Sequence, residues 1–459
     1  MNRLGSMGVW AWLAAMAWLW LGAVSTALAQ GTSQTVPDPI SVRDLEAYCD
    51  RLELSDQQRQ AVVEMHDAYR ADFAKLRETD IEKFLQETRS LQGMGFGALQ
   101  QRDQVVKSLR DMDTIMDRIR ALDNRLFDQV QTVLTEEQTS AMPRVPQMRE
   151  RQRYNSGLGR MATFANPATQ IDVSQIVLDI DVPGDAMQTV DPMLMSYESS
   201  LTNDSRKLHE AATKMMLDML DKLAAAGINE ESMRDNERRG QAFTAIRTAW
   251  GEVNQQMMEQ AAEISELNRR TVRSLGQVMP EASARSLRDE YFQRAYPEAW
   301  GGTSTSKTFD AALKLEDLTP EQMQTLTAMA MEYRTSSDRL SDQMADMIDE
   351  NRRTRSFFDF NTDRQREYQE KLGELRDKRT ALTTSAMDTL KATLGPEKTE
   401  LVEKYVVSAE AQAKSGETRV FATSIGPGGM GGMAAVRLSG TATETGTPTD
   451  DPYLPGPIT

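Results

Sequence analysis

Few residues of this chain have side chains suited to chemistry, and they lie far apart in the sequence. The 459 residues include one cysteine, Cys49, and two histidines, His66 and His209. A single cysteine permits no internal disulfide and no dithiol redox pair, and a zinc site needs several Cys or His ligands close together. We therefore expect each histidine to be a packed or surface residue and not a metal ligand.

Nucleophilic catalysis also lacks support in the sequence. Neither a Ser-His nor a Cys-His pair has local support as a nucleophile with its base, and Cys49 is followed by Asp50, whose charge disfavours the thiolate. Neither histidine has the glutamate three residues before it that a di-iron helical bundle requires. We therefore expect no enzyme activity, no cofactor and no metal centre.

Methionine offers another route to a metal, because thioether sulfur binds Cu(I). The chain has 28 methionines. Pairs at helical spacing, or in one case in a glycine-rich stretch, are Met112/Met116, Met215/Met219, Met344/Met347 and Met430/Met433. Such methionines more often fill a helical core or form an adaptable apolar surface. A Met-based Cu(I)-binding protein is accordingly the weakest of three hypotheses.

Composition limits the other classes of function. The chain has 53 Lys+Arg against 69 Asp+Glu, a formal net charge of −16, and 39% hydrophobic residues. The acidic balance argues against a nucleic-acid binder, which normally carries a basic face. The low hydrophobic content excludes a polytopic membrane protein.

Residues 1–29 resemble a secretory signal peptide. Arg3 precedes an apolar run over 9–24, and Ala27-Leu28-Ala29 gives the small-x-small pattern that predicts cleavage after Ala29. No later stretch is long and apolar enough to span a bilayer. We expect an exported protein, periplasmic or secreted, with an uncleaved N-terminal anchor as the alternative.

Three long blocks of the chain are free of proline, which disfavours helix interiors. Proline is absent between Pro39 and Pro143, between Pro192 and Pro280, and between Pro320 and Pro396. Apolar residues recur at three- and four-residue steps in these blocks, as at Leu109, Met112, Met116, Ile119, Leu122 and Leu126. This spacing predicts amphipathic helices and an all-α fold. Alternating strand patterns are scarce, and the best candidates for strands are Ile171–Val182 and Arg419–Leu438.

The blocks also resemble one another. The segment VPGDAMQTVDPMLMSY over 182–197 aligns without a gap with LTPEQMQTLTAMAMEY over 318–333, and LSDQQRQAVVEMHDAYR over 54–70 follows the same pattern. A related second motif closes each block, at 134–138, 279–282 and 394–398. Three copies of one helical unit explain this pattern.

We therefore predict three tandem long-helix hairpin units, over 41–145, 176–300 and 313–412. An irregular linker over 146–175 and a flexible low-complexity tail over 415–459 complete the chain. A basic run lies at the first linker, at Arg144, Arg149, Arg151, Arg153 and Arg160. We expect these arginines to be solvated; the alternatives are contact with a phosphate-bearing surface or with an acidic unit of the same chain.

The motif residues have a structural role as helix starts. Thr319 can cap a helix and form a capping box with Gln322, while Pro320 suits the first helical position. Ser55 with Gln58 and Thr135 with Gln138 repeat the box. The full set of motif residues is Leu54, Ser55, Gln58, Leu134, Thr135, Gln138, Leu318, Thr319, Pro320, Gln322, Leu394 and Pro396.

Paired motifs of this kind resemble the LTxxQ motifs of the Spy/CpxP family of periplasmic chaperones and envelope-stress proteins. The closest pair here is LSDQQ at 54–58 with LTEEQ at 134–138, followed by LTPEQ at 318–322 with LGPEK at 394–398. The resemblance implies bent helical hairpins that form a cradle-shaped dimer and bind unfolded proteins without ATP. The chain departs from the family in joining three units and in being strongly acidic.

The leading hypothesis is thus an exported, non-enzymatic chaperone that holds unfolded or envelope proteins on Met/Leu-rich helix faces. The alternative is a cell-envelope scaffold whose helices recognise a protein partner. Neither hypothesis involves nucleic acid or a membrane span after signal cleavage, and both permit a homo-oligomer.

Overall fold

The chain is helical wherever the structure describes it. The computed structural model describes residues 36–93, 102–156, 166–228, 231–232, 235–300, 303–354 and 362–421. Regular structure in these ranges consists of helices, with no strand among them, which confirms the predicted all-α class. None of these helices combines the length and apolar character that crossing a bilayer requires. The predicted signal peptide over 1–29 lies outside the described residues. So does most of the predicted tail over 415–459, whose first residues, 415–421, belong to the last helix.

The structure tests only one of the two stretches that alternate like strands. The expectation for Ile171–Val182 is wrong, because α9 occupies Val173–Asp179. Asp172 starts this helix by accepting a hydrogen bond from the Ser174 backbone N–H at 3.0 Å, and a capped start outweighs a short apolar alternation. Most of Arg419–Leu438 lies outside the described residues, and its first residues belong to the last helix.

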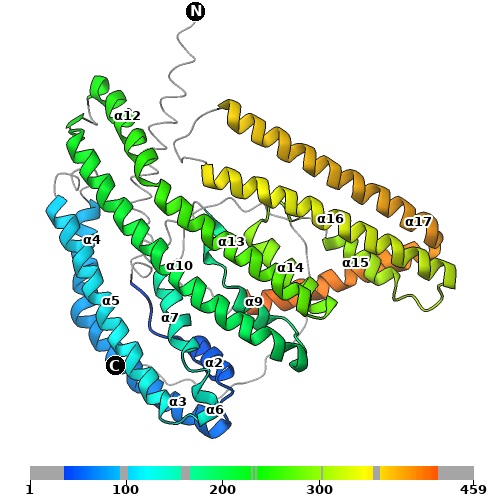
Figure 1. Ribbon diagram of the computed structural model, residues 1–459, viewed down its shortest axis with the longest axis horizontal. Coiled ribbons are helices and arrows are strands. Elements are labelled where there is room, and N and C mark those ends of the chain that lie inside the picture. The colour runs from blue at the N-terminus through cyan, green and yellow to red at the C-terminus, as the bar shows by residue number, and fades with distance from the viewer. Residues whose placement is uncertain are drawn as a thin grey trace, which may run out of the picture.

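The first part of the chain folds back on itself. Its helices are α2 (Val42–Arg51), α3 (Asp56–Leu76), the π-helical turn η1 (Arg77–Ile81), α4 (Glu82–Gly93), α5 (Arg102–Gln131), α6 (Glu136–Thr139) and α7 (Arg144–Tyr154). α3 and α4 pack against α5. α7 leaves this pair and packs mainly on the next long helix (Figure 1).

The middle part is built around two long helices that pack together. Its elements are the 3-10 turn η4 (Pro167–Gln170), α9, α10 (Gly184–Ala225), α12 (Asn236–Val253), α13 (Gln255–Val278) and α14 (Glu281–Ala295). α10 continues through Pro192 and packs against α12 and α13. α14 returns to cover α9 and α13.

The last part is also built around two long helices that pack together. α15 (Thr303–Ala312) packs on α16 (Pro320–Thr354) and on α17 (Thr362–Phe421), although it precedes the predicted boundary of the third unit. α17 is interrupted at Gly395, whose φ of 78° no helix allows. Glycine adopts this left-handed conformation at little cost, and Pro396 then starts the next helical segment.

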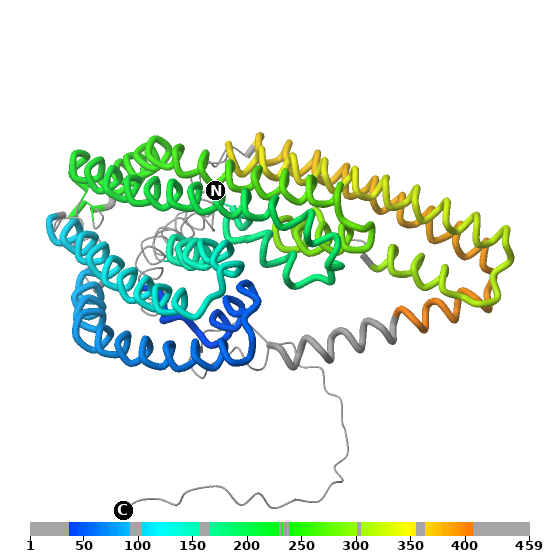
Figure 2. The backbone as a smooth tube through the Cα atoms, turned by 60° about the horizontal axis from the view of Figure 1, so that its bottom comes forward, coloured from blue at the N-terminus to red at the C-terminus, as the bar shows by residue number. Residues whose placement is uncertain are grey.

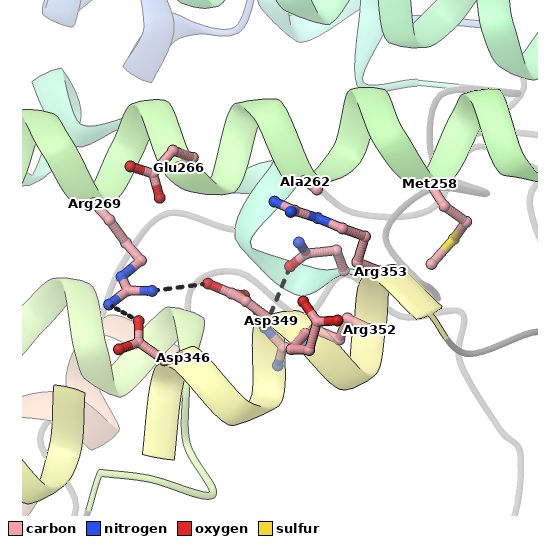
Figure 3. A pocket seen from close by; sticks show the side chains of 10 residues that line it. Met258, Ala262, Glu266, Arg269, Asp346, Asp349, Arg352 and Arg353 are labelled. Atoms are coloured by element: carbon pink, nitrogen blue, oxygen red, sulfur yellow. Dashed lines mark hydrogen bonds and ion pairs between the residues drawn. The ribbon is translucent and has the colours of Figure 1, made fainter. Parts of the chain in front are cut away.

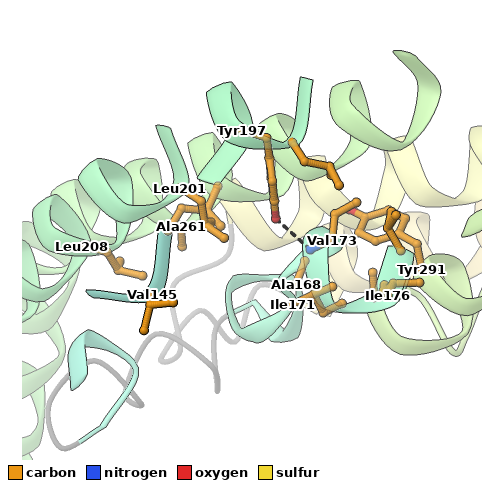
Figure 4. Packing of buried hydrophobic residues seen from close by; sticks show 14 of the residues in the cluster. Val145, Ala168, Ile171, Val173, Ile176, Tyr197, Leu201, Leu208, Ala261 and Tyr291 are labelled. Atoms are coloured by element: carbon orange, nitrogen blue, oxygen red, sulfur yellow. Dashed lines mark hydrogen bonds between the residues drawn. The ribbon is translucent and has the colours of Figure 1, made fainter. Parts of the chain in front are cut away.

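The long helix pairs lie side by side, with α10 and α13 in the middle (Figures 1 and 2). One hydrophobic core runs through the first and middle parts and takes in α16 residues such as Met344 and Ile348. Figure 4 shows a region of it where Val145 from α7 lies near Leu201 and Leu208 from α10. A second, smaller core around Phe309, Tyr333 and Leu390 closes the far end of the last pair. The helix pairs therefore share much of their interior.

Most methionine side chains in the described ranges serve this interior. Met112, Met215 and Met344 are buried in the larger core, and their partners at helical spacing, Met116, Met219 and Met347, pack against it. Met430 and Met433 lie outside the described residues. The exposed methionines are Met195 at 43%, Met323 at 39% and Met331 at 65%. A methionine-based binding surface in the described part of the chain would therefore depend on these three residues.

Candidate functional site

The motif residues start helices through local hydrogen bonds. Ser55 caps α3 and Thr135 caps α6, and each forms a capping box with the glutamine three residues later. The same exchange joins Thr319 and Gln322 at the start of α16, with both bonds at 3.2 Å. The apolar members of the motifs, namely Leu54, Leu134, Leu318 and Leu394, lie in or against the two cores, and Pro320 and Pro396 stand at helix starts.

In the first helix pair the two motifs also bind each other. The Gln58 side chain donates to the Val133 carbonyl at 2.7 Å and to Gln138 Oε1 at 2.8 Å. Gln138 in turn donates to the Glu53 carbonyl at 3.0 Å. Each glutamine thus donates to a backbone carbonyl just beyond the end of one helix and also caps the start of another.

Equivalent bonds occur at the other two helix pairs. Gln322 donates to the Thr393 carbonyl at 2.8 Å, and Lys398 donates to the Asp317 carbonyl at 2.6 Å. In the middle pair Ser283 donates to the Asp181 carbonyl at 2.8 Å. Gln138, Ser283 and Lys398 occupy the same place in their motifs, and each bonds to the carbonyl just before the first motif. The motif residues therefore form a structural joint, and they do not surround a cavity.

One tyrosine per helix pair makes a second recurring contact. The hydroxyls of Tyr69 and Tyr197 donate to Asp123 and Asn268 on the returning helix, each at 2.8 Å. The Tyr333 hydroxyl lies 3.2 Å from Thr383 Oγ1 on α17. These tyrosines occupy matching positions in the aligned segments, which is the signal that would have marked them in the sequence.

The expectation that the arginines of the basic run are solvated is wrong. Arg144, Arg149, Arg151 and Arg153 lie on or at the start of α7, and each is less than a tenth exposed. Each of them forms an ion pair with a carboxylate of the same chain, which was one of the two alternatives to solvation. A buried charge is costly unless it is paired in this way. The pairs are Arg144 with Glu198 and Asp191, Arg149 with Asp123, Arg151 with Asp172, and Arg153 with Asp123 and Glu150. Arg160 lies outside the described residues.

The histidines and the cysteine are packed within the fold. His66 is buried, and its Nε2 lies 2.7 Å from the Ile40 carbonyl. Burial lowers the pKa of His209, with Asp113 acting in the opposite direction. Cys49 is buried in α2, and burial raises the pKa of its thiol. No group of three or more His, Cys, Asp or Glu side chains arranged to hold a metal ion was found within the described ranges.

Two hollows lie between α13 and α16, and the smaller of them is polar. It encloses about 150 Å³ and is shown in Figure 3. Arg269 pairs there with Asp346 at 2.6 Å and with Asp349 at 3.2 Å, and the Tyr296 hydroxyl donates to Asp349 at 2.7 Å. The opposite charges of Arg269 and the two aspartates attract each other across the interface. The side chains that line this hollow therefore hold α13 and α16 together.

The larger hollow is an open groove of about 470 Å³ among α13, α14, Trp300 and α16. Its apolar lining comes from Val272, Phe292, Trp300 and Met331. The Trp300 and Phe292 rings lie 5.6 Å apart, and the Arg288 guanidinium stacks over Phe292 at 4.4 Å. Five arginines and four acidic residues also line the groove. All of these arginines except Arg273 form ion pairs with described carboxylates, including Asp310 and Asp346 outside the lining.

Several groups in this groove lack a partner. Trp300 Nε1 and Arg334 Nε are buried, and neither donates a hydrogen bond to a described residue. Arg273 is exposed and forms no ion pair with any part of the chain that the structure describes. Burial, helped by the carboxylate of Asp338, raises the pKa of Asp289 to about 6. An apolar lining beside an unpaired charged group such as Arg273 is common in binding sites.

Sequence reasoning missed this groove. Of its lining residues only Glu281 belongs to the paired motifs, and its two walls come from helices far apart in the chain. The one available signal was Met331, an apolar residue that falls outside the buried stripe of its helix. Comparisons with protein-family models, with curated proteins and with solved structures found no match to this chain.

Proposed function

We propose that this protein is an exported, non-enzymatic binding protein of the chaperone type, which holds extended segments of unfolded proteins without ATP. The observation that carries the proposal is the 65% exposure of Met331 in a groove also lined by Phe292 and Trp300. Methionine adapts its shape to different apolar partners, which suits a site that accepts varied sequences.

The rest of the fold supports a binding role in three ways. The paired motifs recur at three helix pairs through equivalent hydrogen bonds, which favours the interpretation of a duplicated hairpin and agrees with the resemblance to the Spy/CpxP family. The shared core fixes the two walls of the groove relative to each other. The net charge of −16 opposes self-association of the loaded protein.

A light-scattering assay tests the proposal. A chemically denatured model protein is diluted into buffer without ATP, in the presence of increasing amounts of the exported chain. We expect suppression of aggregation near stoichiometric ratios. Absence of suppression at a several-fold excess would reject the chaperone activity and leave the cell-envelope scaffold as the better hypothesis.

A matched pair of variants tests whether the groove is responsible. Met331→Gln should weaken suppression several-fold because it places an amide at the apolar contact. Met195→Gln is the control, because Met195 occupies the aligned position of α10, is 43% exposed and does not line the groove. Equal loss in both variants would show that binding does not depend on the groove.

A further inference from the structure

The groove lined by Trp300 and Met331 combines apolar side chains with an unpaired cation. Its apolar lining comes from Val272, Phe292, Trp300 and Met331. Arg273 is exposed there and has no ion-pair partner in the described part of the chain. The preferred ligand is therefore a segment that carries a carboxylate close to an aromatic or apolar side chain.

The C-terminal segment of this chain has that chemistry. Residues 449–459 read TDDPYLPGPIT, in which Asp450 and Asp451 are followed closely by Tyr453 and Leu454. Tyr453 is the only aromatic residue after Phe421. Four of the last twelve residues are prolines, which lower the entropy lost on binding and leave carbonyls without competing N–H groups nearby.

Proline-containing segments of this type bind in grooves lined by aromatic side chains. A carboxylate of Asp450 or Asp451 would pair with Arg273, and Tyr453 would pack on Trp300, Phe292 and Met331. The charges are complementary, because the segment is acidic and Arg273 is the one lining arginine that forms no ion pair with a described residue.

We propose that residues 449–459 of the same chain bind in the groove between α13–α14 and α16, as a tethered ligand that a client segment must displace. The connection is long enough, because the chain between Phe421, where α17 ends, and Asp450 could span up to about 100 Å. The whole of α16, with 35 residues, is about 50 Å long. This inference concerns the occupant of the groove, and it can be tested without a client.

Trp300 provides the readout. In a chain that begins at Gln30, only Trp250 and Trp300 remain, so Trp250→Phe leaves Trp300 as the single tryptophan. The fluorescence of this variant, truncated after Pro448, is titrated with a synthetic peptide of residues 449–459. We expect a saturable change. The untruncated variant should bind the same peptide at least tenfold more weakly, because its tethered copy competes at an effective concentration on the order of millimolar.

Matched changes locate the contact. A peptide with Asp450→Asn and Asp451→Asn, or one with Tyr453→Ala, should bind the truncated chain at least tenfold more weakly. Arg273→Gln in the truncated chain should weaken binding of the natural peptide, whereas Met195→Gln should leave it unchanged. No fluorescence change on titration, or equal affinity with and without residues 449–459, would overturn the proposal.

The two proposals can fail separately. Peptide binding with no suppression of aggregation would remove the chaperone function and keep the tethered ligand. Suppression of aggregation that is identical with and without residues 449–459, in a chain that does not bind the peptide, would remove the tethered ligand alone.

Discussion

The side-chain amides of Gln58 and Gln138 hydrogen bond to each other in both directions. Gln58 Nε2 lies 2.8 Å from Gln138 Oε1, and Gln138 Nε2 lies 3.2 Å from Gln58 Oε1. Each glutamine also closes the capping box of its own helix. Two motifs that are 80 residues apart therefore form one joint between the starts of α3 and α6.

Removal of either glutamine should weaken this joint. We expect Gln58→Ala and Gln138→Ala each to lower the free energy of unfolding by about 1–2 kcal/mol, because each leaves backbone groups unsatisfied. The double variant should lose less than the sum, by about 0.5–1.5 kcal/mol, since the two side chains share one interaction. Urea denaturation measures all three values. Gln57→Ala, at an exposed neighbour in the same turn, should change stability little, and strict additivity would contradict the joint.

Much of the fold could be predicted from the sequence because its signals are local. Helical periodicity and proline spacing depend on neighbouring residues, and so does the capping box of Ser55 with Gln58. The bond from Gln58 to Gln138 could not be predicted, since a local capping pattern does not say which distant carbonyl or amide completes it. Only the alignment of the repeated segments indicated that the two motifs belong together.

The arginines of α7 were misread for a related physical reason. A run of charged residues is expected to be solvated when the sequence shows no partners for it. In the structure Arg151 pairs with Asp172 at 2.9 Å and Arg149 pairs with Asp123 at 2.9 Å. The groove was missed for the same reason, because Met331 meets Trp300 only after α16 has packed against the middle helices. A single sequence does not show which residues of other helices become the partners of a given side chain.

Glu198 should be essential for stability. It is 1% exposed and pairs with Arg144 at 2.7 Å and also with Arg51. Glu198→Gln would leave two buried cations short of a counter-charge, so we expect a loss of about 3–5 kcal/mol. Burial, with Arg144 nearby, already lowers the pKa of Arg51 to about 10. Thermal or urea unfolding provides the measurement.

A surface ion pair offers the control for this change. Glu210 pairs with Arg206 at 2.6 Å, but both side chains are exposed. Glu210→Gln should therefore change stability by less than about 1 kcal/mol. Comparable losses from Glu198→Gln and Glu210→Gln would contradict the view that α7 is held by buried charges.

Cys49 should resist thiol reagents in the folded protein. Its side chain is 4% exposed, and burial raises the pKa of its thiol despite the opposing effect of Arg59. We expect labelling by a disulfide reagent to be at least ~100-fold slower in buffer than in urea, since access requires local unfolding of α2. Gln57→Cys in a Cys49→Ala background supplies an exposed thiol for comparison. Equal rates for the native and unfolded protein would show that α2 is not packed as described.

Asp289 should make stability depend on pH between about 4 and 6. Burial and the neighbouring Asp338 raise its pKa to about 6 in the folded protein, whereas an unfolded aspartate titrates near 3.9. The folded state therefore binds more protons than the unfolded state in this window, so the free energy of unfolding falls as pH rises through it. Asp289→Asn removes the titration, and relative to the natural chain it should gain about 1–3 kcal/mol between pH 4 and pH 7. Urea denaturation at both pH values measures the change, with Asp388→Asn, at an exposed position of α17, as the baseline. A difference that stays constant with pH would mean that the groove does not desolvate this carboxyl group.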